Sequence, residues 1–115
     1  MPALLELGAE HVFVCDRQGD AIDSRQRALD VIGDALGLGA TQVAIPVARL
    51  GSAFFDLRTG IAGEIAQIAV NYRLKLAIVG DISDYVARSN AFRDWVVECN
   101  RGEGVRFVLS IAELD

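Results

Sequence analysis

Short apolar runs alternate with amphipathic helical patterns along this chain, and this alternation constrains its fold more than any other feature. Five runs have the length and composition of strands. They cover residues 3–7, 11–15, 42–47, 74–79 and 105–109. Because helical patterns separate the last four runs, the sequence favours a layered α/β fold with a mostly parallel sheet and right-handed crossovers.

The first two runs predict a hairpin. Gly8, Ala9 and Glu10 stand between them and permit a tight turn. Two strands joined by so short a turn run antiparallel. We therefore expect an N-terminal hairpin followed by a βαβαβαβ arrangement, which gives a mostly parallel sheet with an antiparallel edge.

Three helices are predicted between the strands. The first begins near Asp23 and Ser24, where Asp23 and Gln26 have the spacing of a capping box. The second covers about residues 58–72 and the third about 89–100, while residues 49–55 stay unassigned. Apolar residues recur at helical spacing in all three. These stripes are Ala28, Leu29, Ile32, Ala35 and Leu36, then Ile61, Ile65, Ile68 and Tyr72, then Phe92, Val96 and Cys99.

Composition limits the class of protein. The chain has 115 residues, of which 52% are hydrophobic, and this suits a single domain over residues 1–115 with a packed core. No apolar run approaches the roughly 18 residues that a membrane span needs. The first six residues lack a basic segment and include Glu6, so we expect no secretory signal. Two distant cysteines, Cys15 and Cys99, favour a reducing, cytoplasmic setting.

The acidic net charge of the chain limits the classes of partner. A formal net charge of −5 makes nucleic acid an unfavourable partner, because phosphate backbones repel an acidic surface. We expect no membrane partner either. A chain this small and apolar is a candidate homodimer, although no motif marks the contact surface.

Candidate site residues follow the ends of predicted strands. In open α/β sheets, ligands bind beyond the carboxyl ends of the strands. Three segments are expected to meet there, at residues 16–20, 52–59 and 80–85. The polar residues that they offer are Asp16, Asp56, Arg58, Thr59, Asp81, Ser83 and Tyr85, and Gly60, directly after the second segment, is a further binding candidate. Structural roles compete with binding, since Asp56 is also placed to cap a helix and Gly80-Asp81 to end a strand.

We expect no catalytic residue, metal or cofactor, and hence no enzyme. The one histidine, His11, lies in a strand pattern, and the two cysteines occupy apolar faces. One histidine and two distant cysteines are too few for a zinc site. The sequence contains neither a P-loop nor a dinucleotide-binding fingerprint.

Several motifs resemble those of an uncharacterised bacterial family that is known only as a domain of unknown function. They are Phe54-Phe55-Asp56-Leu57, Ala62-Gly63-Glu64-Ile65, Asn71-Tyr72-Arg73, Ala77-Ile78-Val79-Gly80-Asp81 and Glu98-Cys99-Asn100. The pattern covers nearly the whole chain. It implies no established activity.

The layout more remotely resembles the STAS fold of anti-sigma-factor antagonists, through the opening hairpin, the alternating units and closing residues 110–114. In that group an apolar strand leads to an aspartate, then to a phosphorylatable serine or threonine directly before a glycine at a helix start. Phe55-Asp56 and Thr59-Gly60 match in kind. One extra residue separates Asp56 from Thr59, and Arg58 stands where a small residue is usual. The resemblance implies a STAS-like layered fold and makes Thr59 a phosphorylation candidate.

Three functions remain open. The leading hypothesis is a regulatory module that docks an unidentified protein partner through residues 52–63, with phosphorylation of Thr59 as a switch. The alternative is a small-ligand or nucleotide-sensing domain that uses Asp56, Arg58, Asp81 and Ser83 at the carboxyl edge. An enzyme with Asp56 and Asp81 as acid and base is the least favoured.

Overall fold

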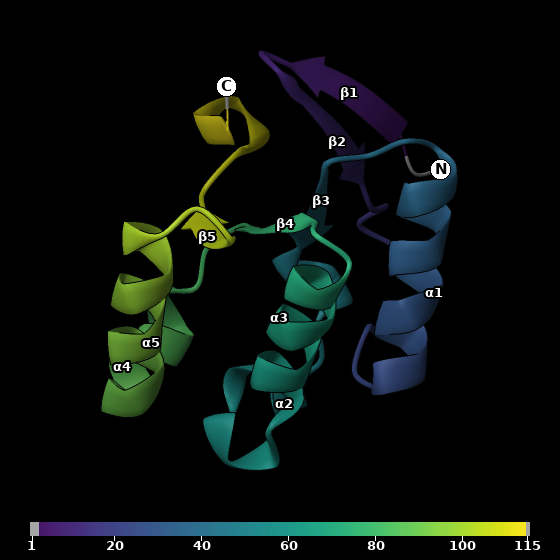
Figure 1. Ribbon diagram of the computed structural model, residues 1–115. Coiled ribbons are helices and arrows are strands. Elements are labelled where there is room, and N and C mark those ends of the chain that lie inside the picture. The colour runs from purple at the N-terminus through teal and green to yellow at the C-terminus, as the bar shows by residue number, and fades with distance from the viewer. Residues whose placement is uncertain (1–2, 115) are drawn as a thin grey trace.

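A mixed sheet of five strands, with helices packed on one face, makes up the described part of the chain in the computed structural model, residues 3–114 (Figure 1). The strands are β1 (Ala3–Leu7), β2 (Glu10–Val14), β3 (Gln42–Pro46), β4 (Lys75–Val79) and β5 (Val105–Val108). They lie in the sheet in their order along the chain. β1 and β2 form the predicted antiparallel hairpin, and the other neighbours are parallel. The expected α/β architecture is confirmed.

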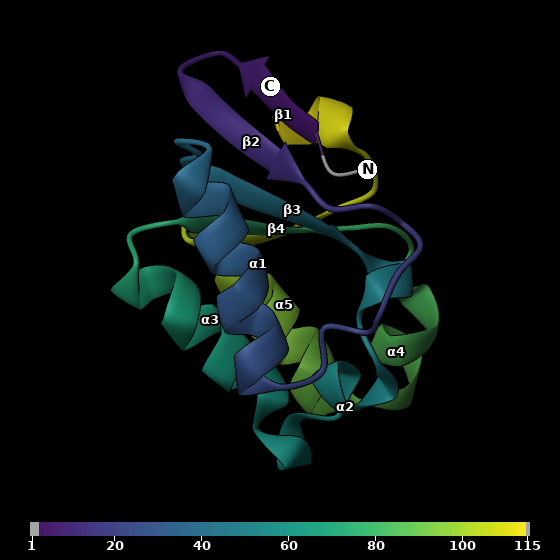
Figure 2. The ribbon, with the colours of Figure 1, turned by 90° about the vertical axis from the view of Figure 1, so that its right-hand side faces the viewer.

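The helices before β5 connect successive parallel strands, and one short helix follows β5. They are α1 (Arg25–Gly37), α2 (Ser52–Phe55), α3 (Ile61–Asn71), α4 (Ser83–Arg88) and α5 (Asn90–Arg101), with short 3-10 helices η1 (Val47–Arg49), η2 (Leu57–Thr59) and η3 (Ile111–Leu114). When each crossover is right-handed and steps to the next strand, all helices fall on the same side. Figure 2 shows this arrangement, with the α-helices below the sheet and η3 above it.

The main core lies between the sheet and the helices. Every second strand residue points toward the helices, and on this face most of these residues are large. The strands supply Phe13, Val43, Ile45, Leu76, Ile78 and Phe107, and the helices supply Ile32, Phe54, Ile65, Ile68 and Phe92. Their burial provides the main apolar contribution to stability.

The opposite face of the sheet has a much smaller cluster. Its buried members are Val12, Ala44, Ala77, Val108 and Leu114. Two of the strand positions are alanines, so little apolar area stands above the sheet there. A single turn, η3, covers part of it through Leu114. We call this surface the open face.

Several helix boundaries differ from the predicted ones. Ser24, not Asp23, caps α1, and its side chain accepts a hydrogen bond from the amide of Arg27. The helix predicted from residue 58 begins at Ile61, because Gly60 has a left-handed φ of 77° that breaks the helix from η2. At the ends of the predicted stripes, Leu36 and Tyr72 are exposed.

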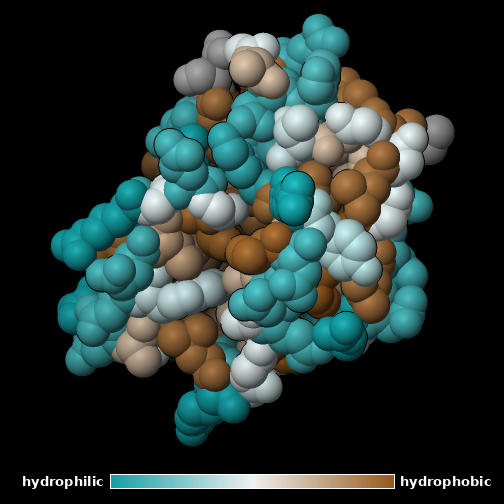
Figure 3. Space-filling model, in the orientation of Figure 1, coloured by the Kyte–Doolittle hydropathy of each residue, from teal (hydrophilic) through white to brown (hydrophobic). Residues whose placement is uncertain are grey.

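Two short helices lie where no helix was expected. α2 occupies part of the unassigned segment, and α4 follows β4 directly after the loop at Gly80. On the surface in Figure 3, polar side chains cover much of the outer helices, and apolar atoms show between them near the middle of the view.

Candidate functional site

The segment from α2 to Gly60 buries aromatic side chains in the core and presents polar side chains at the surface. Phe54 and Phe55 are buried in the main core. They fix the single turn of α2 within the helical layer, where Phe54 lies beside Trp95 and Phe55 beside Phe92. η2 then turns the chain, and Gly60 redirects it into α3. This packing holds Asp56, Arg58 and Thr59 at the surface.

Asp56 caps η2 and binds its neighbour Arg58. Its Oδ1 atom accepts hydrogen bonds from the Arg58 amide at 3.1 Å and from Nε at 3.0 Å, while Oδ2 accepts from Nη2 at 3.0 Å. The Arg58 side chain, through these bonds, lowers the pKa of the Asp56 carboxyl group. The same contacts raise the pKa of Arg58. The pair is therefore charged on both sides, and the Arg58 side chain remains 91% exposed.

Thr59 links three backbone segments. Its hydroxyl lies 2.6 Å from the carbonyl oxygen of Ala53 and 2.8 Å from that of Asp56, and donates to them. The same oxygen accepts a hydrogen bond from the amide of Ile61 at 3.2 Å. Thr59 therefore connects α2, the start of η2 and the first turn of α3. Sequence reasoning found the residue but not this structural role.

A groove of about 480 Å³ separates the α2–η2 segment from α4 and the start of α5. Its lining residues are Ser52, Phe55, Asp56, Leu57, Arg58, Tyr85, Arg88, Ser89 and Ala91. We call it the α2–α4 groove. It brings together three of the predicted site residues, Asp56, Arg58 and Tyr85, whereas Thr59 and Gly60 follow it in sequence without lining it.

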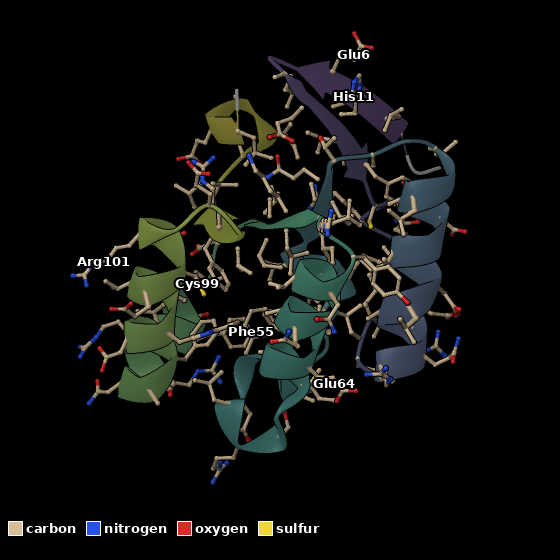
Figure 4. All side chains as sticks on the ribbon, viewed as in Figure 1. Glu6, His11, Phe55, Glu64, Cys99 and Arg101 are labelled. Carbon is tan, nitrogen blue, oxygen red and sulfur yellow. The ribbon has the colours of Figure 1, made fainter. Side chains whose placement is uncertain are left out.

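Aromatic stacking builds the floor of this groove. The rings of Phe55 and Tyr85 stack with centroids 3.8 Å apart and an interplanar angle of 8°. The guanidinium carbon of Arg88 lies 5.3 Å from the centre of the Tyr85 ring, a cation–π distance. Figure 4 shows Phe55 in the helical layer, between α3 and the α4–α5 side of the molecule. The groove thus combines two stacked rings with two arginines.

Asp81 and Ser83 lie at a different place. The Asp81 Oδ1 atom accepts a hydrogen bond from the Ser83 amide at 2.8 Å. The backbone and side chain of Ser83 lower the pKa of Asp81, so the carboxylate is ionised at neutral pH. Asp81 lines a second cavity, and Ser83 lies in the first turn of α4. The residues predicted to form one site therefore line two separate cavities, with Asp56, Arg58 and Tyr85 in the α2–α4 groove and Asp81 in the second cavity.

The second cavity, of about 650 Å³, lies at the carboxyl ends of the parallel strands and borders the open face. Its apolar lining includes Val14, Ala44, Pro46, Val79 and Ile111. Arg17, Asp81 and Ser110 add polar groups. We call it the open-face cavity.

The loop after β2 is held by Arg49, which sequence reasoning did not single out. Arg49 donates from Nε to the Asp20 carbonyl at 2.9 Å and from Nη1 to the Asp16 carbonyl at 3.0 Å. A Cβ atom on Gly19 would lie only 3.0 Å from the Arg49 guanidinium carbon. Asp16, a predicted site residue, thus belongs to a loop fastened to η1 rather than to the groove.

Arg88 is the second residue that the sequence did not reveal. It ends a six-residue helix that begins two residues after Asp81, and so short a polar helix leaves little periodic signal. No residue pattern could have shown that this helix folds back over Phe55.

The other shifted pKa values among the described residues belong to two cysteine thiols and to an ion pair between strands. Burial raises the pKa of the Cys15 thiol to about 11, and burial also raises that of Cys99. The Glu10 carboxylate binds Lys75 Nζ at 2.6 Å, and Lys75 lowers the pKa of Glu10. Among residues 3–114, no group of three or more histidine, cysteine, aspartate or glutamate side chains is placed to hold a metal ion. In the same range, no helix is long and apolar enough to span a membrane.

Together these features define a small α/β domain with an exposed groove that is aromatic and arginine-lined, and a separate cavity at the carboxyl end of its sheet. The sequence matches the family described as a domain of unknown function, DUF4180, over residues 7–115. The chain belongs to this family. Comparisons with curated proteins and with solved structures gave no match.

Proposed function

We propose that this domain is a regulatory protein-interaction module that docks a partner at the α2–α4 groove, with Thr59 as its phosphorylation switch. The observation that carries the proposal is the position of the Thr59 hydroxyl, which donates to Ala53 and accepts from Ile61. A surface threonine that fastens one wall of a groove is well placed to control that groove. The STAS-like layout of the sequence supports the same proposal of a regulatory module with a phosphorylation switch.

The groove has the chemistry of a protein-docking surface. Aromatic residues and arginines are enriched where proteins bind one another, and here Phe55, Tyr85, Arg58 and Arg88 line one groove. The Tyr85 ring is already held in place by its stack on Phe55, so it loses little conformational freedom on binding. A partner segment with an apolar side chain and a nearby carboxylate would complement this surface.

Phosphorylation would change the groove through its η2 wall. A phosphate group only accepts hydrogen bonds at its charged oxygens, so it would repel the Ala53 and Asp56 carbonyls that the hydroxyl now contacts. It would also add negative charge next to Asp56. We expect residues 56–60 to loosen and the groove to lose its shape, so modification would release the partner.

A position-specific photo-crosslinker tests the docking. The probe is placed at Ser52 in the groove and, as a control, at Leu38, which is exposed beyond the end of α1. We expect a defined crosslinked partner from position 52, weakened by Arg88→Ala, and none from position 38. Equal labelling from both positions, or labelling that Arg88→Ala does not change, would contradict docking at the groove.

Mass spectrometry after incubation with lysate and ATP tests the switch. We expect phosphate on Thr59 and weaker crosslinking of the modified protein from position 52. A Thr59→Val variant, which cannot be phosphorylated, controls for modification at other sites. If Thr59 stays unmodified under every stress condition, the proposed phosphorylation switch is wrong, and only the proposed docking at the groove remains.

Small-ligand binding at the carboxyl end is the second candidate, and the open-face cavity is the observation that favours it. The cavity combines an apolar lining with the ionised carboxylate of Asp81. Asp56 and Arg58, which were expected to take part, line the other groove. A thermal-shift screen of metabolites and nucleotides tests this candidate, because a ligand of the folded state raises the melting temperature. A shift that survives Asp81→Asn would place the ligand elsewhere.

A further inference from the structure

Within residues 3–114, the outer strand β1 has a free hydrogen-bonding edge. It stands at one end of the strand order and pairs only with β2 in the described sheet. Its residues are mostly exposed. Leu4 and Leu5 are each 40% exposed, and because they are adjacent in a strand they lie on opposite faces of the sheet. Figure 4 shows Glu6 and His11 projecting from this hairpin.

The hairpin geometry shows which β1 amides point outward. Gly8 and Ala9 form a two-residue turn, and Gly8 has the φ of +60° that a type II′ turn requires at its first position. The residues that flank such a turn, Leu7 and Glu10, form a hydrogen-bonded pair, and these pairs then alternate along the ladder. Leu5 therefore bonds to Val12, while the N–H and C=O groups of Leu4 and Glu6 face away from β2.

The other edge of the sheet is protected and this one is not. β5 is only four residues long and has an arginine at its second position. Arg106 also binds the Glu113 carbonyl of η3. Short length and basic residues are common ways to prevent edge pairing. β1 contains no lysine, arginine or proline, and its only charged residue, Glu6, lies 3.7 Å from His11 Nδ1.

We propose that β1 pairs antiparallel with β1 of a second copy of this chain, around a two-fold axis at Leu5. In this register Leu4 of one copy faces Glu6 of the other, and each such pair exchanges two hydrogen bonds. All four outward-facing groups of Leu4 and Glu6 are then satisfied. The two sheets join into one of ten strands.

The side chains favour this register over the neighbouring one. At the two-fold axis the Leu5 side chains of the two copies meet in a non-hydrogen-bonded pair, where side chains approach most closely. A register centred on Glu6 would instead set two carboxylates directly opposite each other, which is destabilising. Because the edge complements itself under two-fold symmetry, a second copy is the occupant that fits it.

Light scattering with size-exclusion chromatography tests the state of assembly. We expect wild-type protein at twice the chain mass of 12.4 kDa and Leu5→Lys protein at the single mass, because two ammonium groups would face each other at the axis. Leu36→Lys is the matched control, since Leu36 is 42% exposed on α1, and it should remain a dimer. A wild-type monomer at every concentration up to about 1 mM would overturn the proposal.

Amide exchange of the wild-type protein tests the surface without any substitution. We expect the Leu4 and Glu6 amides to become at least tenfold more protected as the protein is concentrated, while the exposed Leu38 amide serves as reference. A dimer in which these two amides exchange as fast as in dilute solution uses another surface, and it would overturn the proposal. So would a Leu5→Lys protein that is folded by its NMR spectrum and still dimeric.

Discussion

Thr59 shows how one side chain can have both a local structural role and a candidate regulatory role. Its hydroxyl is a donor to Ala53 and an acceptor from Ile61. The sequence predicted the residue as a site because it stands before a glycine near a helix start. It did not predict the contact with Ala53, because that contact depends on α2, a single turn with no periodic signal.

Replacing Thr59 by valine should destabilise the fold. Valine has nearly the same shape but leaves the Ala53 carbonyl and the Ile61 amide without this partner. We expect a loss of about 1 kcal/mol in the free energy of unfolding, measured by urea denaturation. Thr59→Ser keeps the hydroxyl and should lose less than half as much. Equal losses in the two variants would mean that the hydroxyl bonds contribute nothing.

The ion pair of Glu10 and Lys75 gives the protein an acid-sensitive contact. It spans from β2 to β4 across β3, with 2.6 Å between Lys75 Nζ and Glu10 Oε1. Lys75 holds the folded pKa of Glu10 below its ordinary value of 4.5. The contribution of the pair is therefore fully present above about pH 4.5 and is lost as the pH falls through the lower folded pKa.

Glu10→Gln should make the unfolding free energy less dependent on pH between neutral pH and pH 3. The measurement is urea denaturation of the variant and the wild type across that range. Glu98→Gln, at an exposed glutamate paired with Arg101 on α5, is the control and should keep a pH dependence closer to that of the wild type. If the Glu10→Gln curve parallels the wild type, the pair does not control acid stability.

At the scale of elements, the strands were predictable and the shortest helices were not. The predicted strand boundaries lie within one residue of the observed ones for all five strands, because apolar runs bounded by turn residues are a strong local signal. α2 and α4 have four and six residues, too few for a helical period to be recognised. Since Tyr85 and Arg88 belong to α4, the groove itself could not be predicted.

An aromatic contact between Tyr85 and Phe55 helps to hold α4 to the rest of the fold. Tyr85→Ala removes the ring that stacks on Phe55 and should cost about 1–2 kcal/mol. It should also speed amide exchange in α4 more than in α5. Tyr85→Phe keeps the ring and should lie within about 0.5 kcal/mol of the wild type. Unchanged exchange in α4 would show that other contacts hold this helix.

At the scale of the whole molecule, the two faces of the sheet differ in how they are covered. The mixed sheet with an antiparallel edge followed from the order of predicted elements and the handedness of crossovers. The thin covering of the open face did not follow, because apolar runs suggest burial on both sides. Only the pairing register shows that Ala44 and Ala77 lie side by side. Their small side chains bury little apolar area on this face, and η3 covers part of it through Leu114.

Leu114 should therefore matter more than its place near the end of the chain suggests. It is buried among Val12, Ala44 and Val108 in the open-face cluster. We expect Leu114→Ala to lower the free energy of unfolding by about 2 kcal/mol and to increase binding of a hydrophobic dye. Leu109→Ala, at a side chain that is 70% exposed, is the control and should have little effect on either measurement. Equal effects would show that η3 does not seal the sheet.

The order of the strands has a consequence for how the protein forms. Each strand after β1 pairs with the strand that precedes it along the chain, so no late strand must insert between two earlier ones. The parallel pairs join residues about 30 positions apart, such as Val12 and Gln42, so each added strand must first close a loop. On the ribosome, where the N-terminal part emerges first, the hairpin can serve as a template to which every later strand is added at a single growing edge.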